Sequence, residues 1–385
     1  MSGDTRRTTK RLSALLTLSL LLAGCAAPAA PTPTPSPAPT RTAALAPSDT
    51  PHPAPPPSAT PDPLPALQLR PGDMYFTVDG NPTFIFTRNL AGVRPDDFET
   101  LVLMARQAGD VLVRVGVDNE AMGGNHGYGY SARGEIETAW TRNWEHFFRV
   151  AEDNGVYVMP YFTGWMNWNT SGFNTWDRNP FNQANGGPAA RPAEIYRRDS
   201  PTQQLYLKWF GDVIARWQSH RNIAAWELVT EINLIDGIGQ AAGVYFAGQL
   251  AQVARANDPL HRPVTVSLAD IDREWPDLYR SDSVDFINFH PYPPSARLDS
   301  YTLRRVRGFL DDYCKPVLIG ESGLNAAEPN TTTGRITLAP NTRIGLQHAR
   351  GAEVVAGAMN GRAFFWEDGY GIYFTEMGLP ALRDL

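Results

Sequence analysis

Three glutamates occur in settings that suit acid–base and nucleophilic catalysis. Glu227 and Glu231 lie four positions apart in the apolar run "AAWELVTEINL" (224–234), and Glu321 directly follows the apolar run "KPVLIG". A pair of carboxyl groups can break a C–O bond, because one donates a proton to the leaving oxygen while the other acts as nucleophile or base. Residues four apart share a face in both a helix and a strand, so the spacing alone leaves open where Glu227 and Glu231 point.

The body of the chain alternates short β-rich runs with longer amphipathic segments. The β-rich runs occupy residues 83–87, 111–115, 156–161, 223–229, 263–268, 285–290, 316–320 and 363–366. Helix-period segments occupy residues 96–107, 136–153 and 201–219, the last with Ser200 as its expected N-cap. Such alternation predicts parallel strands with helices outside them, and eight units predict an α/β protein, a (β/α)8 TIM barrel. An open doubly wound sheet is the alternative, but no glycine-rich phosphate-binding turn follows the first run.

The barrel prediction separates the three glutamates. Residues 223–231 form the fourth strand, which places Glu227 in the packed interior and Glu231 at the C-terminal end of the strand. Glu321 occupies the corresponding end of the seventh strand, so we expect Glu231 and Glu321 to meet where barrel active sites form. A buried carboxylate needs a partner, and Arg114 on the second strand is the predicted partner of Glu227.

Further polar and aromatic side chains are predicted at the same mouth of the barrel. The sixth strand ends in "NFHPY", which brings His290 and Tyr292 there, and the eighth strand ends in Trp366, a flat platform for a sugar ring. The third loop has no helical period, so we expect its aromatic residues to point outward and stack on sugars. These residues are Trp165, Trp168, Phe173 and Trp176.

As an ordered set, these motifs resemble the clan A glycoside hydrolases of family 5, the cellulase and mannanase type. The set comprises "WEL" with the strand-four glutamate, "H-x-Y" after strand six, "P-V-L-I-G-E-S-G" at strand seven and tryptophan at strand eight. The segment "NPFNQANGGP" (179–188) is similar to a stretch of the long third loop in some bacterial members. The resemblance implies an O-glycosyl hydrolase that cleaves a β-linked polysaccharide or oligosaccharide of glucan or mannan type by retaining double displacement, without cofactor or metal.

The resemblance also implies roles for single residues. Glu231 matches the acid/base and Glu321 the nucleophile, while Arg114 and Tyr292 match residues that keep the nucleophile ionised. One position departs from the family pattern, because Thr230 stands where the family has the asparagine that contacts the sugar 2-hydroxyl. The alternative function is therefore a catalytically impaired, carbohydrate-binding surface lipoprotein on the same barrel. A barrel aldolase ranks last, because no lysine follows a predicted strand.

The N-terminal region predicts export and a lipid anchor. Residues 1–24 combine a basic flank with an apolar run that ends in "LAGC", so they are predicted to be a lipoprotein signal peptide with Cys25 as the lipidated residue. Residues 25–68, rich in Pro, Ala and Thr, are predicted to be a disordered linker, and 69–385 to be the hydrolase domain, opening with a β-hairpin at the Asp79-Gly80 turn. We expect the protein on the extracellular face of the membrane or cell surface, touching lipid only through this anchor.

The composition argues against two features, a nucleic-acid partner and a disulfide framework. The net charge is −6, and loss of residues 1–24, which carry four basic residues and one acidic residue, makes the remainder more acidic. An acidic body argues against nucleic acid as a partner and leaves a carbohydrate substrate as the expected ligand. Cys314 is the only other cysteine besides Cys25, so a disulfide framework is not expected.

Overall fold

The computed structural model describes residues 64–90, 95–118, 127–171, 175–269, 274–293, 298–323 and 342–361. The predicted signal peptide, the lipidation site Cys25, most of the predicted linker, Phe173 and the sugar platform Trp366 lie outside these ranges. Of the residues predicted for the active site, all except Trp366 are described.

The strands of the body pair in parallel and follow one another around a TIM-barrel-like sheet. One ladder has the order β11-β3-β4-β5-β6-β7 and a second has the order β10-β9-β8. Only Val266 separates β7 from β8, so these two strands are successive parts of one segment. The backbone amide of Met359, next to β11, donates to the carbonyl of Val317 in β10 at 2.8 Å, which joins the two ends. The strands are β3 (Ile85–Leu90), β4 (Leu112–Gly116), β5 (Tyr157–Tyr161), β6 (Trp226–Glu227), β7 (Val264–Thr265), β8 (Ser267–Ala269), β9 (Ile287–His290), β10 (Val317–Ile319) and β11 (Asn360–Gly361).

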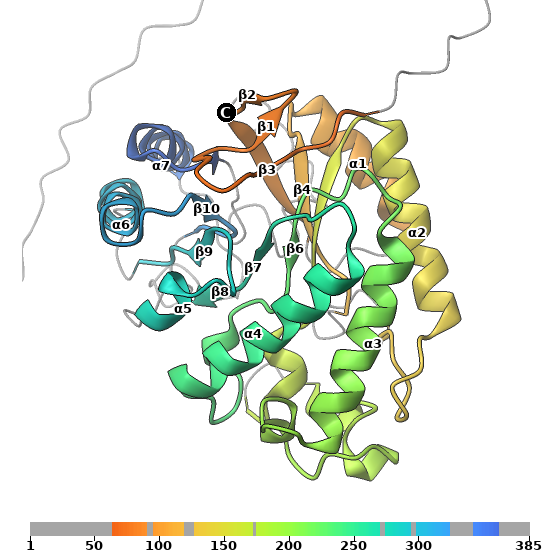
Figure 1. Cartoon of the computed structure of the whole chain (residues 1–385). Helices are drawn as coiled ribbons and strands as arrows, with labels where there is room; N and C mark the ends of the chain where they lie inside the picture. Colours follow the sequence, from red (N-terminus) through yellow and green to blue (C-terminus); the bar gives the residue numbers. More distant parts are fainter. Residues whose placement is uncertain are drawn as a thin grey trace, which may run out of the picture. The chain divides into compact units, whose positions relative to one another are not determined.

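Helices lie outside the strands, as the alternating sequence pattern predicts (Figure 1). The predicted segments 96–107, 136–153 and 201–219 agree with α1, α2 and α3 to within two residues at each end. The hydroxyl of Ser200 accepts a hydrogen bond from the amide of Gln203 at 3.0 Å and so caps α3 as expected. The helices are α1 (Phe98–Gln107), α2 (Thr138–Asp153), α3 (Pro201–Trp217), α4 (Gln240–Asn257), α5 (Pro276–Arg280), α6 (Leu298–Tyr313) and α7 (Thr342–Ala356). Across the described ranges, none of the helices is both long and apolar enough to cross a membrane.

The N-terminal hairpin forms as predicted, but the folded region begins earlier than expected. Strands β1 (Thr77–Val78) and β2 (Asn81–Pro82) pair in antiparallel fashion around the Asp79-Gly80 turn. The prediction extended the linker through residue 68. In the structure Leu67 is buried, and the amide of Gln68 donates to the carbonyl of Thr77 at 3.0 Å. The proline-rich composition obscured this boundary, because the apolar residues at its end pack against the body.

The eighth strand also begins earlier than predicted. Apolar content selected residues 363–366, which lie outside the described ranges, whereas β11 starts at Asn360. The Asn360 side chain accepts from the amide of Ile319 and donates to its carbonyl, each at 2.8 Å. Its amide nitrogen also donates to the hydroxyl of Thr87 at 2.8 Å. The strand thus begins at a buried asparagine whose side chain pairs with neighbouring strands. A search for apolar runs cannot detect a strand that begins with such a residue.

Asp118 is a fully buried carboxyl group two residues after β4. Burial raises the pKa of Asp118 well above its ordinary value, and the neighbouring polar groups of Thr163 and Asn167 offset only part of this effect. The neutral form of this side chain is therefore favoured in the native state. The contribution of Asp118 to the stability of the fold is fully present at low pH. It is lost as the pH rises toward the raised pKa of Asp118 in the folded protein.

We predict that Asp118→Asn stabilises the fold at neutral pH but not under acidic conditions. The stability difference should grow by about 1.4 kcal/mol for each pH unit between the unfolded pKa, about 4, and the raised native pKa. Urea unfolding of both proteins at about pH 4 and about pH 8 measures this difference. Asp212→Asn, at an exposed position, is the matched control. An identical difference at both pH values would contradict the prediction.

Candidate active site

The predicted pair of Arg114 and Glu227 is present inside the barrel. Nε of Arg114 lies 2.6 Å from Oε2 of Glu227, and Nη2 lies 2.8 Å from Oε1. The hydroxyl of Ser267 also donates to Oε1 of Glu227, at 2.7 Å. Both residues are almost completely buried, with side-chain exposures of 2% and 0%. Because both carboxylate oxygens of Glu227 are bound by protein groups, this residue has a structural role.

The same guanidinium group reaches Glu321, which follows β10. Nη1 of Arg114 lies 2.6 Å from Oε1 of Glu321, and the hydroxyl of Tyr292 donates to Oε2 at 2.9 Å. Burial alone would raise the pKa of Glu321, but the electrostatic influence of His290, the charge of Arg114 and the hydrogen bond from Tyr292 together hold it below its usual value. Glu321 is therefore favoured in the ionised form that a nucleophile requires.

Arg114 is itself held by groups that sequence analysis did not single out. Its Nη1 donates to Oδ1 of Asn89 at 3.1 Å, and Nδ2 of Asn89 donates to the carbonyl of Gly320 at 2.9 Å. The guanidinium carbon lies 4.4 Å from the ring centroid of Tyr161. Burial alone would lower the pKa of Arg114, but the carboxylates of Glu227 and Glu321 raise it, so the side chain stays charged. Asn89 could have been identified from the sequence by its position at the C-terminal end of the first barrel strand.

Glu231 lies at the mouth of the barrel but not on a strand. We expected it to continue the fourth strand, whereas β6 ends at Glu227, and Glu231 has left-handed backbone angles of φ 51° and ψ 48°. Its amide donates to the hydroxyl of Ser267 at 2.9 Å, and the short helix η7 (Ile232–Leu234) follows. Left-handed angles are uncommon for residues other than glycine and occur often at functional sites. The backbone turn therefore aims this side chain into the site.

The Glu231 carboxyl group is held between two ring nitrogens. Nε1 of Trp165 donates to Oε2 at 2.9 Å, and Nδ1 of His290 lies 3.0 Å from Oε1. The structure thus places Trp165 as a hydrogen-bond donor to Glu231, a contact that the predicted sugar-stacking role did not include. No arginine or lysine pairs with Glu231 within the part of the chain that the structure describes. This environment contrasts with that of Glu321, which is bound to Arg114.

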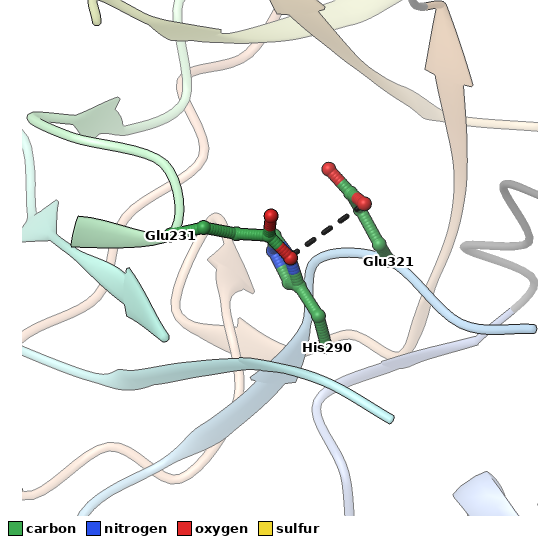
Figure 2. A group of neighbouring side chains, drawn as sticks. All are labelled: Glu231, His290 and Glu321. Atoms are coloured by element: carbon green, nitrogen blue, oxygen red, sulfur yellow. Dashed lines mark hydrogen bonds and ion pairs between the residues drawn. The ribbon is translucent and has the colours of Figure 1, made fainter. Parts of the chain in front are cut away.

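Figure 2 shows the carboxyl groups of Glu231 and Glu321 reaching toward each other, with the His290 imidazole beside them. Each of these three residues contributes an atom to a group in which all atoms lie within 4.8 Å of one another. Retaining glycosidases have carboxyl groups about 5–5.5 Å apart, whereas inverting enzymes need about 6.5–9.5 Å to admit a water molecule. An oxygen of Glu231 and an oxygen of Glu321 thus lie close to each other, as the shorter of these two arrangements requires.

These three side chains are also spaced closely enough to hold a metal ion. Imidazole nitrogen and carboxylate oxygens are ligands for several divalent metals. However, the guanidinium of Arg114 already binds Oε1 of Glu321 at 2.6 Å, which would place a fixed positive charge beside any cation. The charges in the site thus favour a metal-free dyad of carboxyl groups.

Thr230 lies within the buried network and not at an open surface. Its hydroxyl accepts from Nη2 of Arg114 at 2.6 Å and lies 3.2 Å from the hydroxyl of Ser267. Only 4% of the residue is exposed. We predicted Thr230 as a substrate-binding residue, but the structure shows a hydroxyl occupied by protein partners. Its direct role is to hold Arg114.

The third loop divides its tryptophans between the site and the core. Trp165 begins the short helix η3 (Trp165–Trp168) and is partly buried, whereas Trp168 is fully buried and donates to the hydroxyl of Thr163 at 2.9 Å. Trp168 packs against Trp176 and Tyr206. The prediction that Trp168 and Trp176 stack on sugars is therefore wrong. Short 3₁₀ turns fold this loop back over α3, and such turns have no long period to detect in a sequence.

Proteins similar to this chain are found by comparing structures but not by comparing sequences. No protein-family model matches the sequence, and no curated protein sequence matches it. An endo-β-1,4-mannanase from Thermotoga petrophila superposes with a TM-score of 0.57 at 14% identity, covering 80% of this chain and 77% of that chain. A glycoside hydrolase family 5 mannosidase from Rhizomucor miehei gives a TM-score of 0.57 at 12% identity, covering 83% of this chain and 96% of that chain.

A β-1,4-mannanase from the sea hare Aplysia kurodai gives a TM-score of 0.54 at 12% identity, covering 83% of this chain and 96% of that chain. At identities this low the similarity establishes the fold and not the activity. The protein therefore has the TIM-barrel-like α/β fold of these mannanases and of the family 5 mannosidase.

The different environments of Glu227 and Glu231 predict different effects on stability. Glu227→Ala should lower the free energy of unfolding by about 3–5 kcal/mol, because it leaves Arg114 buried without its bidentate partner. Glu231→Ala should change that free energy by about 1 kcal/mol or less, because this side chain is partly exposed and pairs with no arginine or lysine among the described residues. Equilibrium urea unfolding of both variants measures the contrast. Equal losses would contradict the assignment of Glu227 as structural.

Proposed function

We propose that the protein is a retaining O-glycosyl hydrolase that cleaves a β-linked polysaccharide or oligosaccharide of mannan or glucan type by double displacement. One observation carries the proposal: Glu231 and Glu321 lie together, but only Glu321 is bound by Arg114. The two carboxyl groups therefore differ in environment, as acid/base and nucleophile must. Mannanases are among the solved structures with this fold, which puts mannan first among the substrates to test.

In the first step, the ionised carboxylate of Glu321 attacks the anomeric carbon, and the Glu231 carboxyl group donates its proton to the leaving oxygen. Trp165 and His290 fix the orientation of the Glu231 carboxyl group through the contacts described above. In the second step, Glu231 accepts a proton from water, which attacks the same carbon and releases the sugar from Glu321. Neither step requires a cofactor.

Hydrolysis by the purified chain tests the proposal directly. We expect reducing-sugar release from at least one member of a panel of β-mannans, β-glucans and xylans. Glu321→Ala should lower the rate by at least about 10³-fold, whereas Glu99→Ala, at an exposed position on α1, should leave it unchanged. Activity that survives in Glu321→Ala would exclude this residue as the nucleophile.

The hydrogen bond from Tyr292 predicts a shift in pH dependence. Because this bond helps to lower the pKa of Glu321, Tyr292→Phe should raise that pKa and move the acid limb of kcat/KM to higher pH. The wild-type acid limb should lie below about pH 4.5, the ordinary range for a glutamate. Rates on one aryl glycoside measured across the pH range give both limbs. An unchanged acid limb in Tyr292→Phe would contradict this role.

The second candidate function is a carbohydrate-binding protein with impaired catalysis. The observation in its favour is that the Thr230 hydroxyl is bound by Arg114 and lies beside Ser267, so it is not presented to a sugar. The same panel separates the two functions. Binding of one glycan with no hydrolysis of any would support this candidate, and Thr230→Asn would then be the variant in which to seek activity.

We also propose that the protein is exported and attached to the outer face of the membrane or the cell surface through a lipid on Cys25, with the proline-rich residues that follow Cys25 as the spacer. The support is the basic flank, apolar run and "LAGC" sequence near the N-terminus. Cells fed labelled palmitate should label the parent protein but not Cys25→Ala. Equal labelling of both would contradict lipidation at this residue.

A further inference from the structure

A cleft of about 920 Å³ is lined mainly by the short helix η6 (Pro192–Ile195) with the residues beside it and by α4, and also by the two loops that carry Trp165 and Glu231. The loops join where the amide and the hydroxyl of Thr170 donate to Oδ2 of Asp236, at 3.0 and 2.6 Å. Thr170 and Asp236 both line the cleft, and each is five residues beyond Trp165 or Glu231 in the chain. The cleft is therefore built in part from the same two loops as the candidate active site, and none of its lining residues belongs to that site.

Three arginines line this cleft: Arg191, Arg197 and Arg198. Glu194 orients two of them, because its carboxylate lies 2.6 Å from Nη2 of Arg197 and 3.7 Å from Nε of Arg191. The Glu194 side chain is 11% exposed, whereas those of Arg191 and Arg197 are 69% and 56% exposed. One buried carboxylate thus holds two guanidinium groups whose remaining N–H donors face solvent.

The third arginine is fixed by an aromatic ring. The guanidinium carbon of Arg198 lies 4.2 Å from the centroid of the Tyr245 ring, a cation–π contact that does not use the N–H donors of the guanidinium group. Tyr196 also lines the cleft, and its hydroxyl donates to the carbonyl of Asp236 at 2.8 Å. The cleft combines oriented guanidinium groups with two aromatic side chains, on walls that its own hydrogen bonds hold in place.

The charge of the cleft is opposite to that of the chain. Three arginines outnumber the two nearby carboxylates, Glu194 and Asp236, and Thr170 already binds one oxygen of Asp236. The whole chain carries a net charge of −6. A positive cleft on an acidic protein attracts anions and disfavours neutral ligands that offer no acceptor for the guanidinium groups.

We propose that this cleft binds a carboxylate-bearing sugar unit, a uronic acid, of the glycan that occupies the active site. Arginine recognises carboxylates through paired N–H donors, and tyrosine rings pack against the apolar faces of sugars. The substrate class is then an acidic or acid-substituted β-linked polysaccharide. This assignment of substrate rests on the proposed hydrolase function, but binding of the acidic sugar does not require catalysis.

Two matched glycosides test the proposal in the full chain. Methyl β-D-glucuronide and methyl β-D-glucoside differ at one carbon, which bears a carboxylate in the first and a hydroxymethyl group in the second. We expect the glucuronide to bind at least about tenfold more tightly in calorimetric or NMR titration, as one charge-assisted contact would give. The double variant Arg191→Gln/Arg198→Gln should remove this preference. Arg216→Gln, an exposed arginine on α3 outside the cleft, should retain it.

Two further measurements separate this proposal from its alternatives. Glu321→Gln should lose hydrolysis and keep the preference for the glucuronide, so a failure of the proposed catalytic function leaves the cleft assignment measurable. Equal binding of the two glycosides, or a preference that persists in the double variant, would overturn the proposal. Displacement of the glucuronide by acetate at equal concentration would also overturn it, because that result shows attraction of any anion.

Discussion

The arrangement of the site depends on the guanidinium group of Arg114, which is buried between two carboxylates. It binds Glu227 through two contacts and Glu321 through one, and it donates to Thr230 and Asn89. Burying such a group is costly unless every donor is satisfied and the charge is balanced. The barrel meets this requirement by bringing together the ends of strands that are far apart in the sequence.

This central cation also separates the two glutamates that could carry the chemistry. Glu321 lies against Arg114 and Tyr292, which favour its ionised form, while Glu231 lies against Trp165, and His290 contacts both glutamates. Ser267 links the two halves, because it donates to Glu227 and accepts from the amide of Glu231. The ion pair inside the barrel and the carboxyl groups at its mouth thus form one connected network.

Sequence patterns predicted the elements and much of this network, because strand order and inward-facing positions follow from alternation. The pairing of Arg114 with Glu227 required only that both residues face the interior of a barrel. The buried position of Trp168 and the left-handed turn at Glu231 were not predictable, because irregular backbone in short loops leaves no periodic signal. The strand at Asn360 was missed for another reason: its pairing depends on a polar side chain.

Trapping the covalent intermediate tests the central claim most directly. Incubation with 2-deoxy-2-fluoro-β-mannosyl and β-glucosyl fluorides, followed by digestion and mass spectrometry, would locate any attached sugar. We predict that a fluorosugar is attached to the peptide that contains Glu321, and that Glu321→Gln carries no label. A label on Glu231 or on another residue would contradict the assignment of the nucleophile. Hydrolysis of a β-glycan with inversion at the anomeric carbon would contradict double displacement itself.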